Sequence, residues 1–391
     1  MPRDATEWIE EGRMLVEDEH YEEALSAFDH ALALDERNAE VWVLKGNTLA
    51  ELDRHDAALA AYNQALSLDA NDATTWLYKA DTLTHLERFP EALDACENAL
   101  RLDPTDSTTW LLKAASLTVL NRDDEALTAY ERALALDPEE TDAWVGKGDA
   151  LIQLERYPAA AAAYQHALEL DPDETAAWTG LGDALDALDR HADALRAFDS
   201  ALALDDEDVG ALVGKADALA SLDRDEEALA LYDRALAQDD TIQWAWTGKG
   251  DVLANLERED EALAAYDTAL KLEPDSVRAL LGKGICLQTL ERYEEALTIF
   301  DHVQTMEPGE NSLWALKGDA QTGLEHFEEA LASYDRSIGM DAASPWPWYG
   351  KSNALKALGR LQEAAVAHAR AMALAGEDDE DDEDDEDDEQ D

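Results

Sequence analysis

The feature that most constrains this chain is a 34-residue period that runs through the sequence without an insertion or deletion. One register carries tryptophan in nine of eleven repeats, with leucine at 212 and 280: Trp8, Trp42, Trp76, Trp110, Trp144, Trp178, Trp246, Trp314 and Trp348. Sixteen residues later every repeat has an alanine, from Ala24 to Ala364. A fixed period of this length indicates a stack of similar units rather than one globular core.

Within each repeat, apolar residues recur at helical spacing in two blocks separated by a short polar turn, such as residues 154–158. Each block predicts an amphipathic helix of about 13 residues, or about 20 Å. Alanines allow the two backbones to approach closely, and the larger tryptophan, leucine and tyrosine side chains fill the space between repeats. A single pair cannot bury its apolar face, so the pairs must stack. The sequence therefore predicts an all-α chain.

The order of tryptophan, alanine, aromatic, alanine and Asp-Pro resembles the tetratricopeptide repeat family over residues 5–378. With tryptophan at position 4, the eleven repeats begin at 5, 39, 73, 107, 141, 175, 209, 243, 277, 311 and 345. The resemblance implies a right-handed superhelical α-solenoid of eleven 34-residue helix-turn-helix repeats. It also implies that the first helices line a concave groove that binds segments of other proteins. Residues 379–391 are predicted to form a disordered acidic tail.

The chain is strongly acidic, with a formal net charge of −61. The last fifteen residues carry only 14 of its 91 acidic side chains, so the acidity belongs to the whole surface. Such a surface repels itself, and concentrated salt screens that repulsion over a Debye length of about 3 Å at 1 M. The composition resembles that of proteins from the cytosol of extreme halophiles. The alternative is an acidic protein that binds basic partners.

Several classes of function are not expected. No basic patch suited to nucleic acid is visible, and Cys96 and Cys286 have neither disulfide nor metal-site spacing. No nucleophile–base pair, metal cluster or cofactor loop is recognisable, so we expect no enzyme activity, metal or cofactor. The N-terminus has no apolar core of signal-peptide length, and no run of 18 apolar residues occurs. We therefore expect a cytoplasmic monomer without membrane contact.

Position 7 of the repeat carries nine of the chain's eleven lysines. These are Lys45, Lys79, Lys113, Lys147, Lys215, Lys249, Lys283, Lys317 and Lys351. Position 25 is acidic in eight repeats, and the antiparallel helices are expected to place positions 7 and 25 opposite each other, as in a pair between Lys215 and Asp233. The alternative is a cationic ladder for an acidic ligand.

The expected groove carries aspartate at position 9 and glycine at position 6 in most of the central repeats. The predicted ligand residues there are Asp149, Asp183, Asp217, Asp251, Gly146, Gly180, Gly214 and Gly248. An acidic groove favours a cationic segment or a helix N-terminus. Mid-helix glycine costs about 1 kcal/mol relative to alanine. It therefore either leaves an open floor for a ligand or makes room for packed neighbours.

Two tryptophans, Trp244 and Trp346, stand outside the main register at position 2. Exposed tryptophans are frequent interface hot spots, although each could instead stack on the neighbouring Trp246 or Trp348. The leading hypothesis is a non-enzymatic adaptor that binds a peptide or helix of a protein partner in the groove of repeats 5 to 9, where the acidic side chains favour a basic segment. The alternative is a structural or assembly spacer that acts through its acidic tail or end faces.

Overall fold

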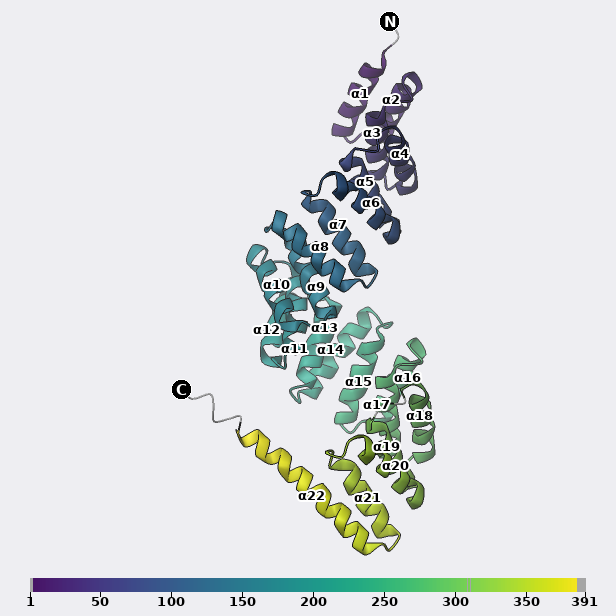
Figure 1. Ribbon diagram of the computed structural model, residues 1–391, viewed down its shortest axis with the longest axis vertical. Helices are drawn as coiled ribbons and strands as arrows, with labels where there is room; N and C mark the ends of the chain where they lie inside the picture. Colours follow the sequence, from purple (N-terminus) through teal and green to yellow (C-terminus); the bar gives the residue numbers. More distant parts are fainter. Residues whose placement is uncertain (1–2, 308, 310, 385–391) are drawn as a thin grey trace. The chain divides into compact units, whose positions relative to one another are not determined.

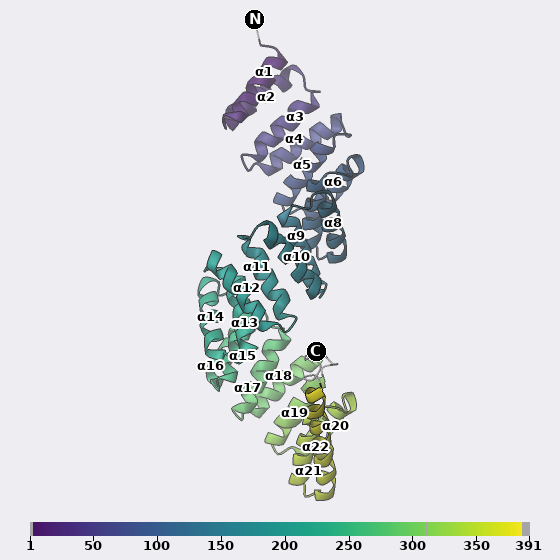
Figure 2. The same cartoon turned by 90° about the vertical axis from the view of Figure 1, so that its left-hand side faces the viewer.

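The computed structural model describes residues 3–384 except 308 and 310. These residues form twenty-two helices arranged as eleven helix-turn-helix pairs, which confirms the predicted all-α repeat architecture. Figures 1 and 2 show the pairs following one another in chain order. No strand occurs in the described part of the chain.

Each repeat supplies one first helix and one second helix. The first helices are α1 (Ala5–Glu17), α3 (Ala39–Ala50), α5 (Ala73–His85), α7 (Ser107–Val119), α9 (Thr141–Gln153), α11 (Thr175–Asp186), α13 (Val209–Ala220), α15 (Gln243–Asn255), α17 (Val277–Thr289), α19 (Asn311–Gly323) and α21 (Trp346–Ala357). The second helices are α2 (Tyr21–Leu34), α4 (His55–Leu68), α6 (Phe89–Leu102), α8 (Asp123–Leu136), α10 (Tyr157–Leu170), α12 (His191–Leu204), α14 (Asp225–Gln238), α16 (Glu259–Leu272), α18 (Tyr293–Met306), α20 (Phe327–Met340) and α22 (Leu361–Asp384).

The chain divides into two compact units, the first ending at Asp206 and the second beginning at Glu207. The first unit holds α1 to α12 and the second holds α13 to α22. Within each unit, every second helix packs on its own first helix, and each one that is followed by another repeat of the same unit also packs on the first helix of that repeat. Inside a unit, consecutive repeats therefore stack on one another, as expected of a solenoid.

The turn inside each repeat depends on one residue with a positive φ at position 15. Ten of these residues are aspartate, glutamate or asparagine with φ between 54° and 62°, and Gly359 (φ 73°) takes the place in the last repeat. At Asp53 the chain reverses, and the amide of Arg54 donates to the carbonyl of Leu49 at 2.9 Å. The left-handed residue ends each first helix, because it lets the amide of the following residue donate to a carbonyl that the helix leaves free.

Consecutive repeats are joined by the aromatic residue at position 24. Tyr164 is 1% exposed, and its ring lies against two glycines from different first helices. A methyl group added at Gly148, in the same repeat, would lie 2.5 Å from the ring. One added at Gly180, in the next repeat, would lie 2.4 Å from it. The glycines at positions 8 and 6 thus make room for one aromatic ring, which holds two first helices and one second helix together.

Lysines at position 7 also join repeats, because they form ion pairs with the acidic residue at position 25 of the preceding repeat. Asp233 accepts an ion pair from Lys249 of the following repeat at 2.6 Å, and its expected pair with Lys215 of its own repeat stays a prediction. Lys45 binds Asp29 in the same way at 2.6 Å. The ammonium of Lys249 also lies 5.1 Å from the centre of the Trp246 ring. Where this brace forms, it links a repeat to the one before it.

Lys79 shows what happens when the acidic partner is missing. The residue at position 25 of the preceding repeat is Asn63, and no carboxylate in the described chain lies within ion-pair distance of Lys79. Its ammonium lies 5.0 Å from the centre of the Trp76 ring. Burial lowers the pKa of Lys79, because the charged form is desolvated without a close counterion.

Helix α22 continues to Asp384, so it extends beyond residue 378, where the predicted tail begins. Residues 385–391 of that predicted tail lie outside the described residues.

The packing around position 24 predicts opposite effects for two glycine substitutions in the second unit. In Gly282→Ala, the new methyl would lie 2.5 Å from Tyr266 and should lower the free energy of unfolding by about 1–3 kcal/mol. In Gly339→Ala, the methyl meets nothing within 4 Å and should raise it by about 0.5–1 kcal/mol. Urea unfolding followed by circular dichroism measures both changes. Equal effects would contradict the packing argument.

The inter-repeat brace predicts a salt-dependent loss of stability in Lys249→Met. The methionine keeps most of the apolar stem but removes the charge, which should lower the free energy of unfolding by at most about 1 kcal/mol. The loss should shrink in 1 M NaCl, because salt screens half-exposed ion pairs. Lys271→Met is the matched control, since Lys271 is exposed and makes no ion pair within the described chain. Thermal melts in both salts test this; identical shifts for the two variants would argue against the brace.

Candidate functional site

Positions 2, 5, 6 and 9 of successive first helices form a shared surface, which we call the inner face. Successive first helices contact each other directly, as α9 does with α11 in the first unit and α15 with α17 in the second. Within the described chain, no two second helices approach each other as closely. Each unit therefore curves toward its first helices, which places the inner face on its concave side. The predicted ligand aspartates and glycines all lie on these helices.

The aspartates of the inner face accept hydrogen bonds from buried tyrosines of their own repeats. The Tyr164 hydroxyl donates to Oδ1 of Asp149 at 2.7 Å, and the Tyr266 hydroxyl donates to Oδ1 of Asp251 at 2.7 Å. Asn47 takes the same role in the second repeat, where it accepts from Tyr62 at 2.7 Å. The residue at position 9 thus satisfies the one polar group of the aromatic side chain that joins the repeats.

Burial raises the pKa of the aspartate and of the tyrosine in this hydrogen-bonded pair. Desolvation raises the pKa of Asp149, and the hydrogen bond from Tyr164 opposes this only in part. Burial and the neighbouring carboxylates of Asp149 and Asp183 raise the pKa of Tyr164 well above its usual value. Asp319 behaves like Asp149, with a pKa raised by desolvation. The inner face therefore carries carboxylates whose ionised form is poorly compensated.

The structure gives a packing explanation for glycines at position 6, for which the sequence allowed two interpretations. Gly146 lies against the ring and hydroxyl of Tyr130 from the preceding repeat, and Gly248 lies in the same way against Tyr232. An added methyl would come within 2.4 Å of the tyrosine in each case. The space above these glycines is therefore filled by protein rather than left open. Gly214, on α13, is half-buried.

Two inner-face aspartates of the second unit receive a second donor from position 2 of the next repeat. The guanidinium of Arg278 donates to Oδ2 of Asp251 at 2.7 and 3.0 Å. The indole of Trp346 donates to Oδ2 of Asp319 at 3.1 Å. Trp346 and Trp244 are each 62% exposed, so both tryptophans predicted to be hot spots present their rings to solvent.

An apolar pocket on the inner face of the first unit was not predicted from the sequence. It has a volume of about 470 Å³ and lies between α5, α7 and α9. Its apolar floor is formed by Leu77, Leu111 and Tyr130, and carboxylates of Asp81 and Asp142 stand among its lining residues. No lysine or arginine lines it. The signal in the sequence was leucine at position 5 of repeats 3 and 4, followed at position 6 by Tyr78 and Leu112, where the central repeats have glycine.

The second unit has a comparable pocket of about 530 Å³. Leu281, Ile285, Leu316 and Trp346 contribute its apolar side chains, and Pro347 closes one side. Trp346 thus combines three properties of an interface residue, namely an exposed ring, a hydrogen bond to Asp319 and a place in an apolar pocket.

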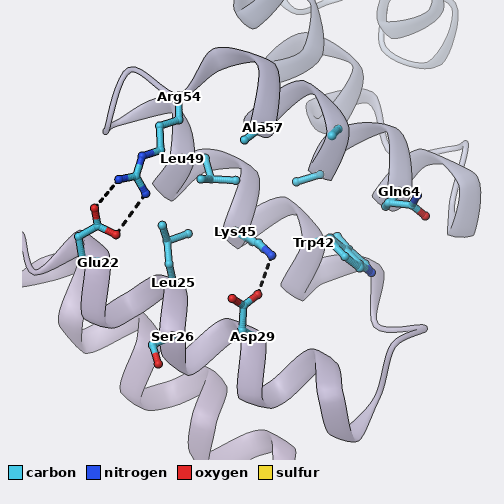
Figure 3. Close-up of a pocket in the computed structure, with 12 residues that line it drawn as sticks. Glu22, Leu25, Ser26, Asp29, Trp42, Lys45, Leu49, Arg54, Ala57 and Gln64 are labelled. Carbon is cyan, nitrogen blue, oxygen red and sulfur yellow. Dashed lines mark hydrogen bonds and ion pairs between the residues drawn. The ribbon is translucent and has the colours of Figure 1, made fainter.

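A third pocket, of about 690 Å³, lies on the other side of the first helices, between α2, α3 and α4 (Figure 3). Lys45 points into it and binds Asp29, while Arg54 binds Glu22 at 2.5 Å. Lys45 and Asn47 are two residues apart and so lie about 200° apart around the helix. The charges in this pocket neutralise each other, which distinguishes it from the acidic inner face.

Other features of the described residues point to no chemical centre. No group of three or more histidine, cysteine or acidic side chains in residues 3–384 is arranged to hold a metal ion. Cys96 and Cys286 are free and buried, and burial raises their pKa values to about 12 and about 11. In that same part of the chain, none of the helices combines the length and the apolar character needed to cross a bilayer.

Fold and inner face together define a helical-repeat protein whose stacked first helices share one exposed surface in each unit. The chain belongs to the tetratricopeptide repeat family. One family model, described as tetratricopeptide repeat, matches residues 9–73, 57–107, 119–175, 179–241 and 247–311, and a second model of the same description matches residues 312–344. Proteins of this family mediate protein–protein interactions.

Two solved structures share this fold with TM-scores above 0.5, and a third is similar over part of the chain. A chain in the crystal structure of the APC/C hetero-tetramer Cut9–Hcn1 is 13% identical, with a TM-score of 0.55 over 93% of this chain and 92% of that chain. A tetratricopeptide repeat protein from Parabacteroides merdae is 15% identical, with a TM-score of 0.52 over 64% of this chain and 98% of that chain. YrrB, described as a TPR protein with an unusual peptide-binding site, is 26% identical, with a TM-score of 0.39 over 48% and 97% of the two chains. None of the curated proteins compared with the chain matches it.

The raised pKa of Asp149 predicts a pH-dependent effect of Asp149→Asn. The substitution should keep the tyrosine hydrogen bond, as Asn47 does naturally, and remove a desolvated charge. The pKa of Asp149 is higher in the folded chain than in the unfolded chain, so its ionised form destabilises the fold at neutral pH. That penalty disappears as the pH falls below the range in which the carboxyl ionises.

We therefore expect Asp149→Asn to raise the melting temperature at pH 7, with a difference that vanishes near pH 3.5. Asn47→Asp, the reverse change in the second repeat, should lower the melting temperature at pH 7. Thermal melts followed by circular dichroism at both pH values measure these differences. A lower melting temperature for Asp149→Asn at pH 7 would contradict the assignment.

Proposed function

We propose that this protein is a non-enzymatic scaffold that binds a segment of a partner protein on the inner face of its first helices. The observation that carries this proposal is the apolar pocket of about 470 Å³ on the inner face of the first unit. Its leucines are only partly buried, so a partner side chain placed there would remove further apolar surface from water. Family membership supports a protein partner.

The shape and charge of the inner face favour a narrow, basic segment. Several consecutive first helices contribute to one surface, and such surfaces in repeat proteins suit extended or helical peptides. Asp81 and Asp142 line the first-unit pocket, where no lysine or arginine balances them. Complementary charge would speed association and select basic partners over acidic ones.

The proposed binding places differ from the region favoured by the sequence. Repeats 5 to 9 were expected to bind, on the strength of their glycines and aspartates. Tyrosine rings lie against Gly146, Gly180 and Gly248, whereas the apolar pockets involve repeats 3 to 5 in the first unit and repeats 9 to 11 in the second. In the second unit, Trp244 and Trp346 remain the proposed aromatic contacts, because both rings are exposed.

Selection of peptides from a random display library on the full-length chain tests this proposal. A peptide that binds the first-unit pocket should lose at least about tenfold in affinity on Leu111→Asp, because burying an unpaired carboxylate in an apolar pocket costs more free energy than its attraction for basic residues returns. Leu136→Asp is the matched control, since Leu136 is 42% exposed, lies on α8 and does not line the pocket. Circular dichroism checks that both variants remain folded.

Deletion of residues 379–391, the predicted acidic tail, distinguishes binding in the groove from the alternative, a spacer that acts through that tail. The scaffold proposal expects the selected peptides to bind the truncated chain as they bind the full chain. Loss of binding on truncation, with retention in Leu111→Asp, would overturn the groove proposal in favour of the tail.

A further inference from the structure

The repeats of this protein provide an internal comparison at position 9. In repeat 8, Asp251 accepts from the Tyr266 hydroxyl through Oδ1 and from the Arg278 guanidinium through Oδ2. In repeat 5, Asp149 accepts the equivalent tyrosine bond through Oδ1. The residue equivalent to Arg278 in the following repeat is Ala176, which has no donor in its side chain. Within the described residues, Oδ2 of Asp149 accepts no hydrogen bond.

The chain itself therefore shows which group fits beside an inner-face aspartate of this kind. Arg278 reaches Asp251 from position 2 of the next repeat with both Nε and a terminal nitrogen within 3.0 Å of one oxygen. The packing around Asp149 desolvates its carboxylate, but part of the side chain still reaches the surface, so an arginine brought by another molecule could occupy the equivalent place. A guanidinium suits this place better than an ammonium, because two of its donors can converge on a carboxylate in a fixed geometry.

Asp149 is also close to the apolar pocket of the first unit. Tyr130 lines that pocket, and its ring contacts α9 at Gly146, one turn from Asp149. Asp142, another lining residue, precedes Asp149 by seven residues on α9, which is about 10 Å along the helix. Burial raises the pKa of Tyr130, and the charges of Asp149 and Asp142 raise it further, as expected if the three groups lie together.

We infer that Asp149 binds an arginine side chain of the partner segment while an apolar side chain of the same segment occupies the pocket formed by Leu77, Leu111 and Tyr130. This inference rests on the proposed function and specifies its ligand. An extended peptide advances about 3.3 Å per residue, so the arginine and the apolar residue would be about three residues apart. The arginine would supply to Asp149 the donor that Arg278 supplies to Asp251.

The test uses two fluorescein-labelled peptides that differ only in charge. The first has a leucine with an arginine three residues away on each side, joined by glycine and serine; the second has citrulline in place of both arginines. Citrulline keeps hydrogen-bond donors but has no charge. Fluorescence anisotropy with the full-length protein should show at least about tenfold tighter binding of the arginine peptide, as expected for a charge-assisted bond.

Two variants should remove this preference by different routes. Ala176→Arg places an internal guanidinium beside Asp149, in the manner of Arg278, and Asp149→Asn removes the charge while keeping the tyrosine bond. The matched controls are Ala192→Arg and Asp173→Asn, which make the same charge changes at exposed positions away from the inner face. Both controls should retain the preference.

The outcomes separate this inference from the proposed function. Equal binding of the two peptides by the natural protein, with loss of both on Leu111→Asp, would overturn the arginine site and leave groove binding intact. A preference that survives Ala176→Arg and Asp149→Asn, or that the control variants abolish equally, would show attraction by overall charge and overturn the inference. Failure of both peptides to bind would also overturn it.

Discussion

The structure depends on the contact between one aromatic ring and glycines of two successive first helices. Tyr164 shows why, since its ring needs the missing side chains of Gly148 in its own repeat and of Gly180 in the next one. Neither helix could approach as closely if either glycine carried a methyl group. The same residue brings a hydroxyl to the inner face, where Asp149 accepts its hydrogen bond. Packing between repeats and the polar chemistry of the inner face therefore have a common origin.

This common origin explains why an aspartate recurs on a surface where its charge is poorly compensated. A buried hydroxyl without an acceptor costs about 1–3 kcal/mol, so an acceptor at position 9 stabilises the ring that joins the repeats. Asparagine would serve equally, as Asn47 does for Tyr62, but aspartate leaves a second oxygen available. In the second unit the chain supplies a donor for that oxygen, from Arg278 or Trp346. The residue at position 2 of the next repeat thus decides whether the second oxygen of such an aspartate has a hydrogen-bond donor within the chain.

The sequence predicted the helices, their pairing and their stacking, because tryptophan, alanine and aromatic residues recur at fixed positions. It did not predict which acid each lysine binds, although it contained a signal. Leu181 replaces the lysine of repeat 6, and the residue 16 positions before it is the uncharged Gln165, whereas Asp199 in the same repeat remains acidic. The joint loss of both charges favours pairing between repeats. The apolar pockets could not be predicted, because side chains from three helices must meet before a pocket exists.

The desolvated carboxylate also links partner binding to proton release. An arginine placed beside Asp149 would favour the ionised carboxylate and therefore lower its pKa. Since the pKa of Asp149 is raised in the free protein, binding would release part of a proton at pH values between the two pKa values. Affinity for an arginine-bearing segment should then increase as the pH rises through that interval. A carboxylate that destabilises the free protein would thus contribute to selectivity for guanidinium, because the charge that the fold leaves uncompensated is the charge that the partner neutralises.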